Sequence, residues 1–402
     1  MRLTLVLILP VIILNVLLDW YIYRAARLHA TKHRRILSRI ALWSSVVLTL
    51  FIIVITALPK KEGSNSDLVT IMWALYFYFS IYLPKFVWVL IDLIGKLPKL
   101  WHRKPLSGAR IAASVMAGII FGAMWFGVIN TSRIDVREVT FSDPAVPESF
   151  DSLRIAQISD LHTGTYGSDT SFVSKLVDRV NSLQPDLILF TGDIVNRRSD
   201  ELLPFVNVLA RLRAPMGVYS ILGNHDYGDY YNWTSPEAKE ENMQLLKDLQ
   251  AGMGWVMLNN ASKTFHNQGD SIVLIGVENI GDHPFPVYGD LEKAYPHDLA
   301  DPAFKILMSH NPAHWVDDIK ESPDKNIPLT LSGHTHAMQM SVGRISPAAF
   351  RYPTWGGMYG DTDNAHRLYV NIGDGEVAIP ARIGATPEIT LITLRKGPRD
   401  SR

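Results

Sequence analysis

Acidic, amide and imidazole side chains follow the ends of five apolar, strand-like runs, and these are the residues whose types and spacing could do chemistry. Open α/β sheets bind ligands beyond the carboxyl ends of their strands, so we expect the five junctions to meet at one edge. Carboxylate oxygens and imidazole nitrogens are common protein ligands of divalent transition metals. The sequence therefore predicts a metal site built around Asp160, His162, Asp193, Asn224, His225, Asp226, His310, His334 and His336.

The number of candidate ligands indicates two metal ions rather than one. Seven side chains are too many for one tetrahedral zinc ion and suit two six-coordinate ions that share a bridging carboxylate. Mixed nitrogen and oxygen ligands without sulfur favour Mn, Fe or Zn, and the imidazoles argue against Ca or Mg. Two ions about 3.5–4 Å apart can clamp a phosphoryl group and lower the pKa of a bridging water. The expected ligands of these two divalent ions are Asp160, His162, Asp193, Asn224, His310, His334 and His336.

Each junction taken alone has a simpler interpretation. Asp160 could cap the following turn, Asn224 could be an ordinary turn residue, and His310 could lie in a surface loop. Five such junctions in one chain favour a shared site over five coincidences. The other histidines after residue 131 fall outside the pattern and are interpreted as surface or core residues, namely His266, His283, His297, His314 and His366.

Strands alternate with helices in residues 131–402, the part of the chain that would position these side chains. Amphipathic patterns predict helices over 171–183, 202–212 and 241–249. The alternation indicates a layered α/β domain. Alternating or continuously apolar runs predict strands over 134–141, 153–158, 187–190, 218–222, 255–258, 272–277, 304–308, 329–331, 368–372 and 389–394.

Residues 1–130 have the composition of a membrane domain. A membrane-spanning helix needs roughly 18–20 apolar residues. Lys85 and Asp92 lie in or near the third apolar run and would share a helix face. Such charges are either functional or close enough to the membrane surface to reach it, and the sequence assigns them no role. Four runs are near or above the required length, over residues 3–22, 40–58, 68–94 and 111–129.

Basic residues predict the orientation of these spans. The first and third connections are rich in Lys and Arg, whereas the second connection, residues 59–67, is nearly neutral. The positive-inside rule places the two basic connections in the cytoplasm. We therefore expect a multi-pass protein of the cell membrane with both termini, and the whole of residues 131–402, outside the cytoplasm.

Overall composition excludes several classes of function. The 402 residues include 39 Lys and Arg and 39 Asp and Glu, so the net charge of zero gives no indication of a nucleic-acid partner. The chain contains no cysteine, which excludes disulfides, thiolate zinc sites and cysteine nucleophiles.

The order of the chemical blocks resembles that of the calcineurin-like metallophosphoesterases. The blocks are Asp-x-His, Gly-Asp, Gly-Asn-His-Asp, a single His and Gly-His-x-His, and the resemblance extends over residues 153–394. The closing stretch, residues 380–391, resembles the bacterial membrane-anchored phosphodiesterase branch. The resemblance implies an αββα sandwich of two mixed sheets, which here would follow about four transmembrane helices.

The same resemblance implies roles for the individual residues. His225 would be the general acid that protonates the leaving alkoxide, and Asp226 would orient its ring. Asn196, Arg197 and Arg198, which follow the Gly-Asp block, receive no assignment. One ion would be held by Asp160, His162 and His336 and the other by Asn224, His310 and His334, with Asp193 as the bridge.

The expected function is that of a membrane-anchored phosphoesterase with two metal ions. It would hydrolyse phosphate esters or pyrophosphates of lipids or envelope metabolites by attack of a metal-bridging hydroxide on phosphorus. The expected partner is thus a phosphorylated small molecule or lipid. The alternative is a metal-binding sensor or membrane assembly protein without catalysis, which the intact set of ligands and the intact acid disfavour.

Overall fold

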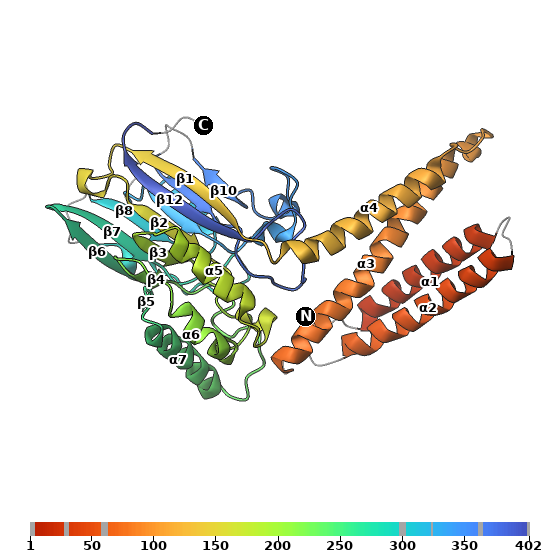
Figure 1. The fold of residues 1–402 in the computed structure, drawn as a ribbon, viewed down its shortest axis with the longest axis horizontal. Helices are drawn as coiled ribbons and strands as arrows, with labels where there is room; N and C mark the ends of the chain where they lie inside the picture. The colour runs from red at the N-terminus through yellow and green to blue at the C-terminus, as the bar shows by residue number, and fades with distance from the viewer. Residues whose placement is uncertain are drawn as a thin grey trace. The chain divides into compact units, whose positions relative to one another are not determined.

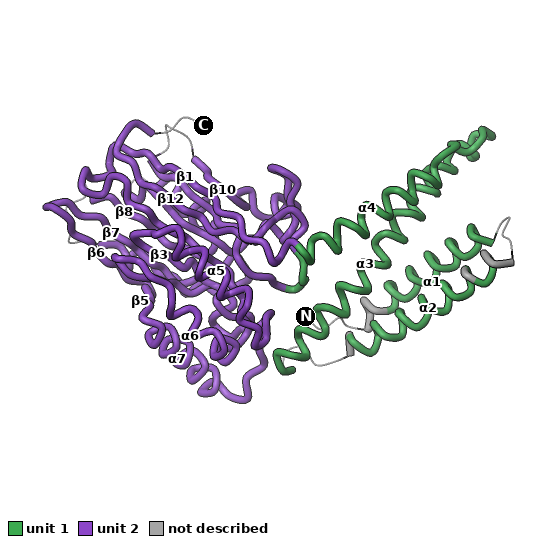
Figure 2. The backbone as a smooth tube through the Cα atoms, in the orientation of Figure 1, with its two compact units in different colours: residues 1–129, 378–381 green, residues 130–377, 382–402 purple. Residues whose placement is uncertain are grey.

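The computed structural model describes residues 5–27, 32–57, 63–296, 303–322, 325–360 and 365–399. Two compact units are present (Figure 2). One unit comprises Met1–Ile129 with Ala378–Ala381, and the other comprises Asn130–Val377 with Arg382–Arg402. Four positions named in the sequence analysis lie outside the described residues. They are residues 3 and 4, which begin the first expected span, residue 58, which ends the second, and His297.

Four long helices make up the N-terminal unit (Figure 1). Each contains a segment that is long and apolar enough to cross a membrane, as the four apolar runs predict. A capping box formed by Ser64 and Asp67 begins the third helix. The helices are α1 (Leu5–Arg27), α2 (Lys32–Ala57), α3 (Asn65–Lys96) and α4 (Ala109–Asn130).

Five charged side chains of the helical unit form ion pairs: Lys85 with Asp19, and both Lys96 and Arg110 with Asp92. Lys85 Nζ on α3 donates hydrogen bonds to Asp19 Oδ1 on α1 at 2.8 Å and to Ser45 Oγ on α2 at 2.7 Å. Asp92 Oδ1 accepts a hydrogen bond from Arg110 Nε on α4 at 3.2 Å. Since an unpaired charge in hydrocarbon is costly, these contacts tie the four helices together.

Two six-stranded sheets form the second unit. The first has the order β1 (Asp135–Asp143), β12 (Glu388–Lys396), β2 (Arg154–Ile158), β3 (Leu187–Phe190), β4 (Val218–Ser220) and β5 (Val256–Met257). The second has the order β10 (Gly357–Tyr359), β11 (Arg367–Val370), β9 (Leu329–Ser332), β8 (Phe304–Met308), β7 (Asp270–Gly276) and β6 (Ala261–Asn267). Both sheets are mixed. In the first sheet β2 to β5 run parallel, and β12 pairs with β2 in the antiparallel direction. In the second sheet β7, β8, β9 and β11 run parallel, and β6 and β10 are antiparallel to their neighbours.

The two sheets pack face to face and carry helices on their outer sides. Leu187 and Leu189 of β3 share one buried cluster with Ile306 and Leu329 of the other sheet. On the outer face of the first sheet lie α5 (Ser171–Ser182) and α7 (Pro236–Gly252) (Figure 1). Short helices follow at α6 (Val206–Leu209) and α8 (Leu291–Ala294), the latter packed on the second sheet. The predicted αββα sandwich is confirmed.

Departures from the predicted elements have local causes. The helix expected over 202–212 is a 3-10 turn, Ser199–Phe205, followed by the single turn α6. Pro204 lies inside that turn and lacks the backbone N–H that a continuous helix requires. Strands β6 and β10 carry no long apolar run, which is why the sequence did not predict them.

Candidate metal centre

All nine side chains of the predicted site lie in loops that follow parallel strands of the two sheets. The loops after β2, β3 and β4 contribute from the first sheet, and those after β8 and β9 contribute from the second. The centre therefore lies at the carboxyl edge of both sheets, as open α/β sheets favour.

One group of potential ligand atoms comes from Asp160, His162 and His336, and all three residues are buried. Asp160 Oδ1 lies 3.3 Å from His336 Nε2, and the Nε2 atoms of the two imidazoles are 3.0 Å apart. The backbone N–H of His334 donates to both carboxylate oxygens of Asp160 at 3.0 Å. Three donor atoms thus face a common point.

A second group of potential ligand atoms comes from Asp193, His310 and His334. His310 Nε2 lies 3.2 Å from Asp193 Oδ2 and 3.2 Å from the side-chain oxygen of Asn224. That oxygen is also 2.9 Å from His334 Nδ1. Asp193 also adjoins the first group, since its Oδ2 lies 3.6 Å from His162 Nε2, and it forms a further group with His162 and His225. The structure therefore brings the seven expected ligands together.

Backbone carbonyls fix the orientation of two imidazoles. His310 Nδ1 lies 2.7 Å from the carbonyl oxygen of Thr191, and His225 Nδ1 lies 2.7 Å from that of Asn196. A carbonyl only accepts, so in each ring Nδ1 carries the proton that is donated. The Nε2 lone pair of His310 is then available to a metal ion. Tyr230 stacks on the ring of His225 with 4.3 Å between the ring centroids.

Asp226 does not orient the His225 ring, so that expectation is wrong. Its carboxylate is buried and accepts hydrogen bonds from backbone N–H groups of both the β3 and the β4 loop. The side chain is buried, and hydrogen bonds from four backbone amides occupy its two oxygens, which therefore do not contact the His225 ring. Burial and the nearby Asp193 carboxylate both raise the pKa of the Asp226 carboxyl, and the hydrogen bonds from the amides lower it. The net result is a pKa of about 7. The donors are the N–H groups of Asp193, Ile194, Val195 and Gly223, at 2.9–3.2 Å.

Several expected ligands have a strained backbone. Asp160, His162, Asp193, His334 and His336 all have φ between 49° and 74°, the left-handed region that L-residues rarely adopt. Each such residue costs on the order of 1–3 kcal/mol, and strain of this kind persists where the fold overdetermines a functional geometry.

Gly333, which precedes His334, is required for a steric reason. A Cβ on Gly333 would lie 2.3 Å from Asp160 Oδ2, so only glycine lets the β9 loop approach that carboxylate.

The protonation states of four of the buried groups fit a pair of divalent cations, and His310 is the exception: burial alone would lower its pKa, but Asp193 raises it to about 9. Burial alone would raise the pKa of Asp160, but His336 and His310 hold it below its ordinary value. Burial would likewise raise the pKa of Asp193, which His310 lowers instead. Burial lowers the pKa of His334 to about 3 and also lowers that of His162. Ionised carboxylates and neutral imidazoles are the forms that bind metal ions.

Three further residues support the site and were missed in the sequence. The hydroxyl of Tyr352 lies 2.9 Å from His334 Nε2, and Asn224 Nδ2 donates to the hydroxyl of Tyr230 at 2.8 Å. Buried Glu201 Oε2 accepts from the backbone N–H of Asn196 at 2.6 Å and so holds the carbonyl that faces His225. The Gly-Asp block could have directed attention to Asn196, but no sequence signal marked Glu201 or the tyrosines.

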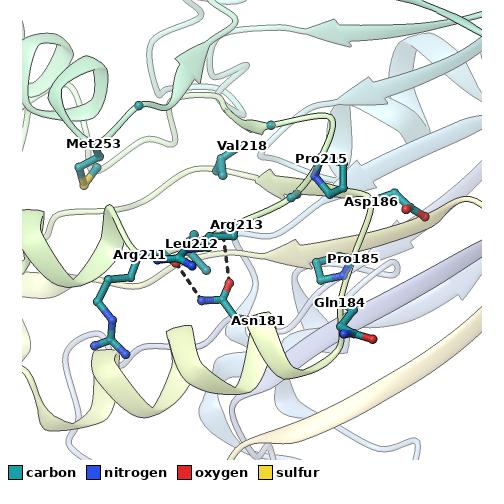
Figure 3. Close-up of a pocket in the computed structure, with 13 residues that line it drawn as sticks. Asn181, Gln184, Pro185, Asp186, Arg211, Leu212, Arg213, Pro215, Val218 and Met253 are labelled. Carbon is teal, nitrogen blue, oxygen red and sulfur yellow. Dashed lines mark hydrogen bonds between the residues drawn. The ribbon is translucent and has the colours of Figure 1, made fainter.

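A cavity of about 100 Å³ adjoins the centre and is lined by Asn224, Tyr230, His334 and Tyr352, among others. A larger hollow of about 1080 Å³ lies among the loops that precede β3 and β4, and Asp186 and Pro215 are among its lining residues (Figure 3). That hollow is at the amino edge of the first sheet, whereas the candidate ligands lie at the carboxyl edge.

Comparison with known proteins places this geometry in a family. Residues 153–338 match the calcineurin-like phosphoesterase domain, and residues 1–131 match the transmembrane domain of probable calcineurin-like phosphoesterases. The chain is 30% identical over 319 residues to a zebrafish (Danio rerio) transmembrane protein with metallophosphoesterase domain, covering 75% of this chain and 68% of the relative. The chain belongs to the calcineurin-like phosphoesterase family. As a phosphoesterase with four candidate membrane spans, it is a membrane protein.

Two bacterial proteins are also similar to this calcineurin-like phosphoesterase. It is 29% identical over 310 residues to the uncharacterized metallophosphoesterase YkuE of Bacillus subtilis, covering 75% of this chain and 98% of the relative. It is 26% identical over 324 residues to LpxG of Chlamydia trachomatis, described as a UDP-2,3-diacylglucosamine pyrophosphatase, covering 69% of this chain and 94% of the relative.

Proposed function

We propose that this calcineurin-like phosphoesterase uses two divalent metal ions to hydrolyse a phosphate ester or pyrophosphate. One observation carries the proposal: potential ligand atoms from the loops after β2, β3, β8 and β9, together with His225 of the loop after β4, gather into adjoining groups, and the members of each group lie within 4.8 Å of one another. We assign Asp160, His162 and His336 to one ion, Asn224, His310 and His334 to the other, and Asp193 to both. When bound, such ions polarise the phosphoryl oxygens and lower the pKa of a water molecule.

The side chains of this protein supply the remaining steps. In its cationic form, with both ring nitrogens protonated, His225 donates the Nε2 proton to the leaving oxygen and becomes neutral, while its Nδ1–H stays bonded to the carbonyl of Asn196. The stacked ring of Tyr230 limits rotation of the imidazole. Asp226 holds the loops that carry Asp193 and His225 at a fixed distance through its four backbone contacts. It acts as a positioning residue.

Lipid-linked pyrophosphates are the substrate class that we favour. The similar Chlamydia protein is described as a pyrophosphatase acting on a diacylated sugar nucleotide. A catalytic unit attached to four candidate spans meets such amphipathic substrates at the bilayer surface. The basic first and third connections support a catalytic unit on the extracytoplasmic side.

A metal and substrate screen on the purified full-length protein tests the proposal. Nitrophenyl phosphate, its bis-ester and lipid pyrophosphates are compared with Mn, Zn and Fe, and bound metal is measured. Asp193→Asn should abolish hydrolysis and reduce the bound metal below two ions, because both sites lose their shared oxygen. Asp248→Asn, at an exposed carboxylate on α7, is the matched control. Two ions and near-normal turnover in Asp193→Asn would contradict the two-ion assignment.

A further inference from the structure

An exposed apolar segment, Met338–Phe350, lies immediately beyond the metal centre in the chain. Phe350 is 98% exposed, Val342 78% and Ile345 77%, and Met338 and Met340 are exposed as well. Isolated apolar side chains are common on protein surfaces, but five exposed ones within 13 residues are a local concentration of the kind found at interaction sites.

The exposed apolar segment is held in a defined conformation. Val342 and Ile345 exchange two backbone hydrogen bonds of 2.8 and 3.1 Å across a tight turn. Ser346 Oγ donates to the carbonyl of Ala337 at 2.7 Å. Ala337 and Ala348 are fully buried and anchor the ends of the turn in the protein. The apolar side chains are therefore presented by an anchored backbone.

The chemistry of the exposed apolar segment fits the surface of a bilayer. Arg344 is exposed between Val342 and Ile345, whereas Arg351, exposed beside Phe350, donates a hydrogen bond to Asp282 Oδ2 at 2.8 Å. Long cationic side chains keep their charge at the headgroup level while neighbouring apolar groups enter the acyl boundary. Anionic headgroups attract such cations. A lipid surface is always adjacent to this chain, because the chain carries four candidate membrane spans.

The exposed apolar segment is continuous with the metal centre at both ends. It begins two residues after His336 and ends two residues before Tyr352, whose hydroxyl lies 2.9 Å from His334 Nε2. We propose that Met338–Phe350 inserts into the bilayer surface and that the centre takes the phosphorylated headgroup of a lipid from that surface. The choice of substrate rests on the proposed function, whereas the insertion does not.

Fluorescent labelling of the full-length protein in lipid nanodiscs tests the insertion. The chain has no cysteine, so Phe350→Cys and Ile345→Cys each create a unique labelling position. An environment-sensitive dye there should be quenched by spin-labelled lipids and protected from aqueous iodide. Val256→Cys, at a 47% exposed position on β5, is the control and should show the reverse.

Two labelling results would overturn the insertion. In one, iodide quenches both segment positions as strongly as the control. In the other, neither quencher reaches the dye, which would mean that protein covers the segment.

A kinetic test then links the exposed apolar segment to its substrate. Combined Val342→Ser, Ile345→Ser and Phe350→Ser should lower kcat/KM for a lipid pyrophosphate in vesicles by roughly tenfold or more. Turnover of water-soluble nitrophenyl phosphate should remain unchanged. Equal losses on both substrates would refute selection of a lipid by the segment. If the unmodified protein hydrolyses no phosphoester, the proposed function fails, while the quenching result still decides whether the segment inserts.

Discussion

Replacing Asp226 by Asn distinguishes a carboxylate that braces two loops from one that orients His225. Oδ1 accepts from the amides of Ile194 and Val195, and Oδ2 accepts from those of Asp193 and Gly223. Asparagine keeps one accepting oxygen and turns an NH2 group toward the other two donors. Two buried N–H groups then lose their partner, at about 1–3 kcal/mol each.

The expected loss in the free energy of unfolding is therefore about 2–6 kcal/mol, from two unsatisfied donors. For a domain of this size 1 kcal/mol corresponds to roughly 2–4 °C, so Tm should fall by at least about 4 °C. Bound metal should fall too, because Asp193 loses the contact that fixes its loop. The assay is thermal unfolding of the full-length protein in detergent, followed by circular dichroism, with metal analysis and Asp248→Asn as control.

The rates of Asp226→Asn on substrates with good and poor leaving groups test whether Asp226 only holds the two loops. If Asp226 acts only as a brace, its loss should slow substrates with good and poor leaving groups by similar factors. Suppose instead that Asp226→Asn unfolds at the normal temperature, retains both ions and loses activity only on poor leaving groups. Asp226 would then act on the His225 ring, and the bracing role would be wrong.

Three further predictions concern the acid, its support and the topology. His225→Ala should slow poor leaving groups far more than nitrophenolate and retain both ions; equal slowing, or metal loss, would mean that His225 is not the acid. Glu201→Gln should weaken the hold on the Asn196 carbonyl and reproduce part of this selectivity without metal loss, which rate and metal measurements on the same substrates would reveal. A reporter active only outside the cytoplasm should give signal when fused at Arg402 and at Gly63 but not at Pro105, and a silent Arg402 fusion beside an active Pro105 fusion would reverse the orientation.

Local patterns in the sequence were sufficient for the main architecture. Apolar length predicted the four candidate spans, and the change from helical to alternating periodicity predicted the α/β layers. The short loops after the strands could be identified because each joins an apolar run to a potential ligand, with a glycine before the ligand in three of the five. Residues such as Asp160 and His336 could thus be assigned to one centre before their distance was known, because carboxyl ends of parallel strands share an edge.

Only the tertiary structure decided what the neighbouring polar groups do. Asp226 follows His225 in sequence, yet its oxygens face amides of the β3 loop, about thirty residues away in the chain. Glu201, Tyr352 and the partner of Lys85 were equally hidden. A strand or span is determined by the periodicity of adjacent residues, whereas a hydrogen-bond partner depends on which distant segments the fold brings within about 3 Å. The sequence therefore determined which residues reach the centre, and the packing of the two sheets decided how each is held.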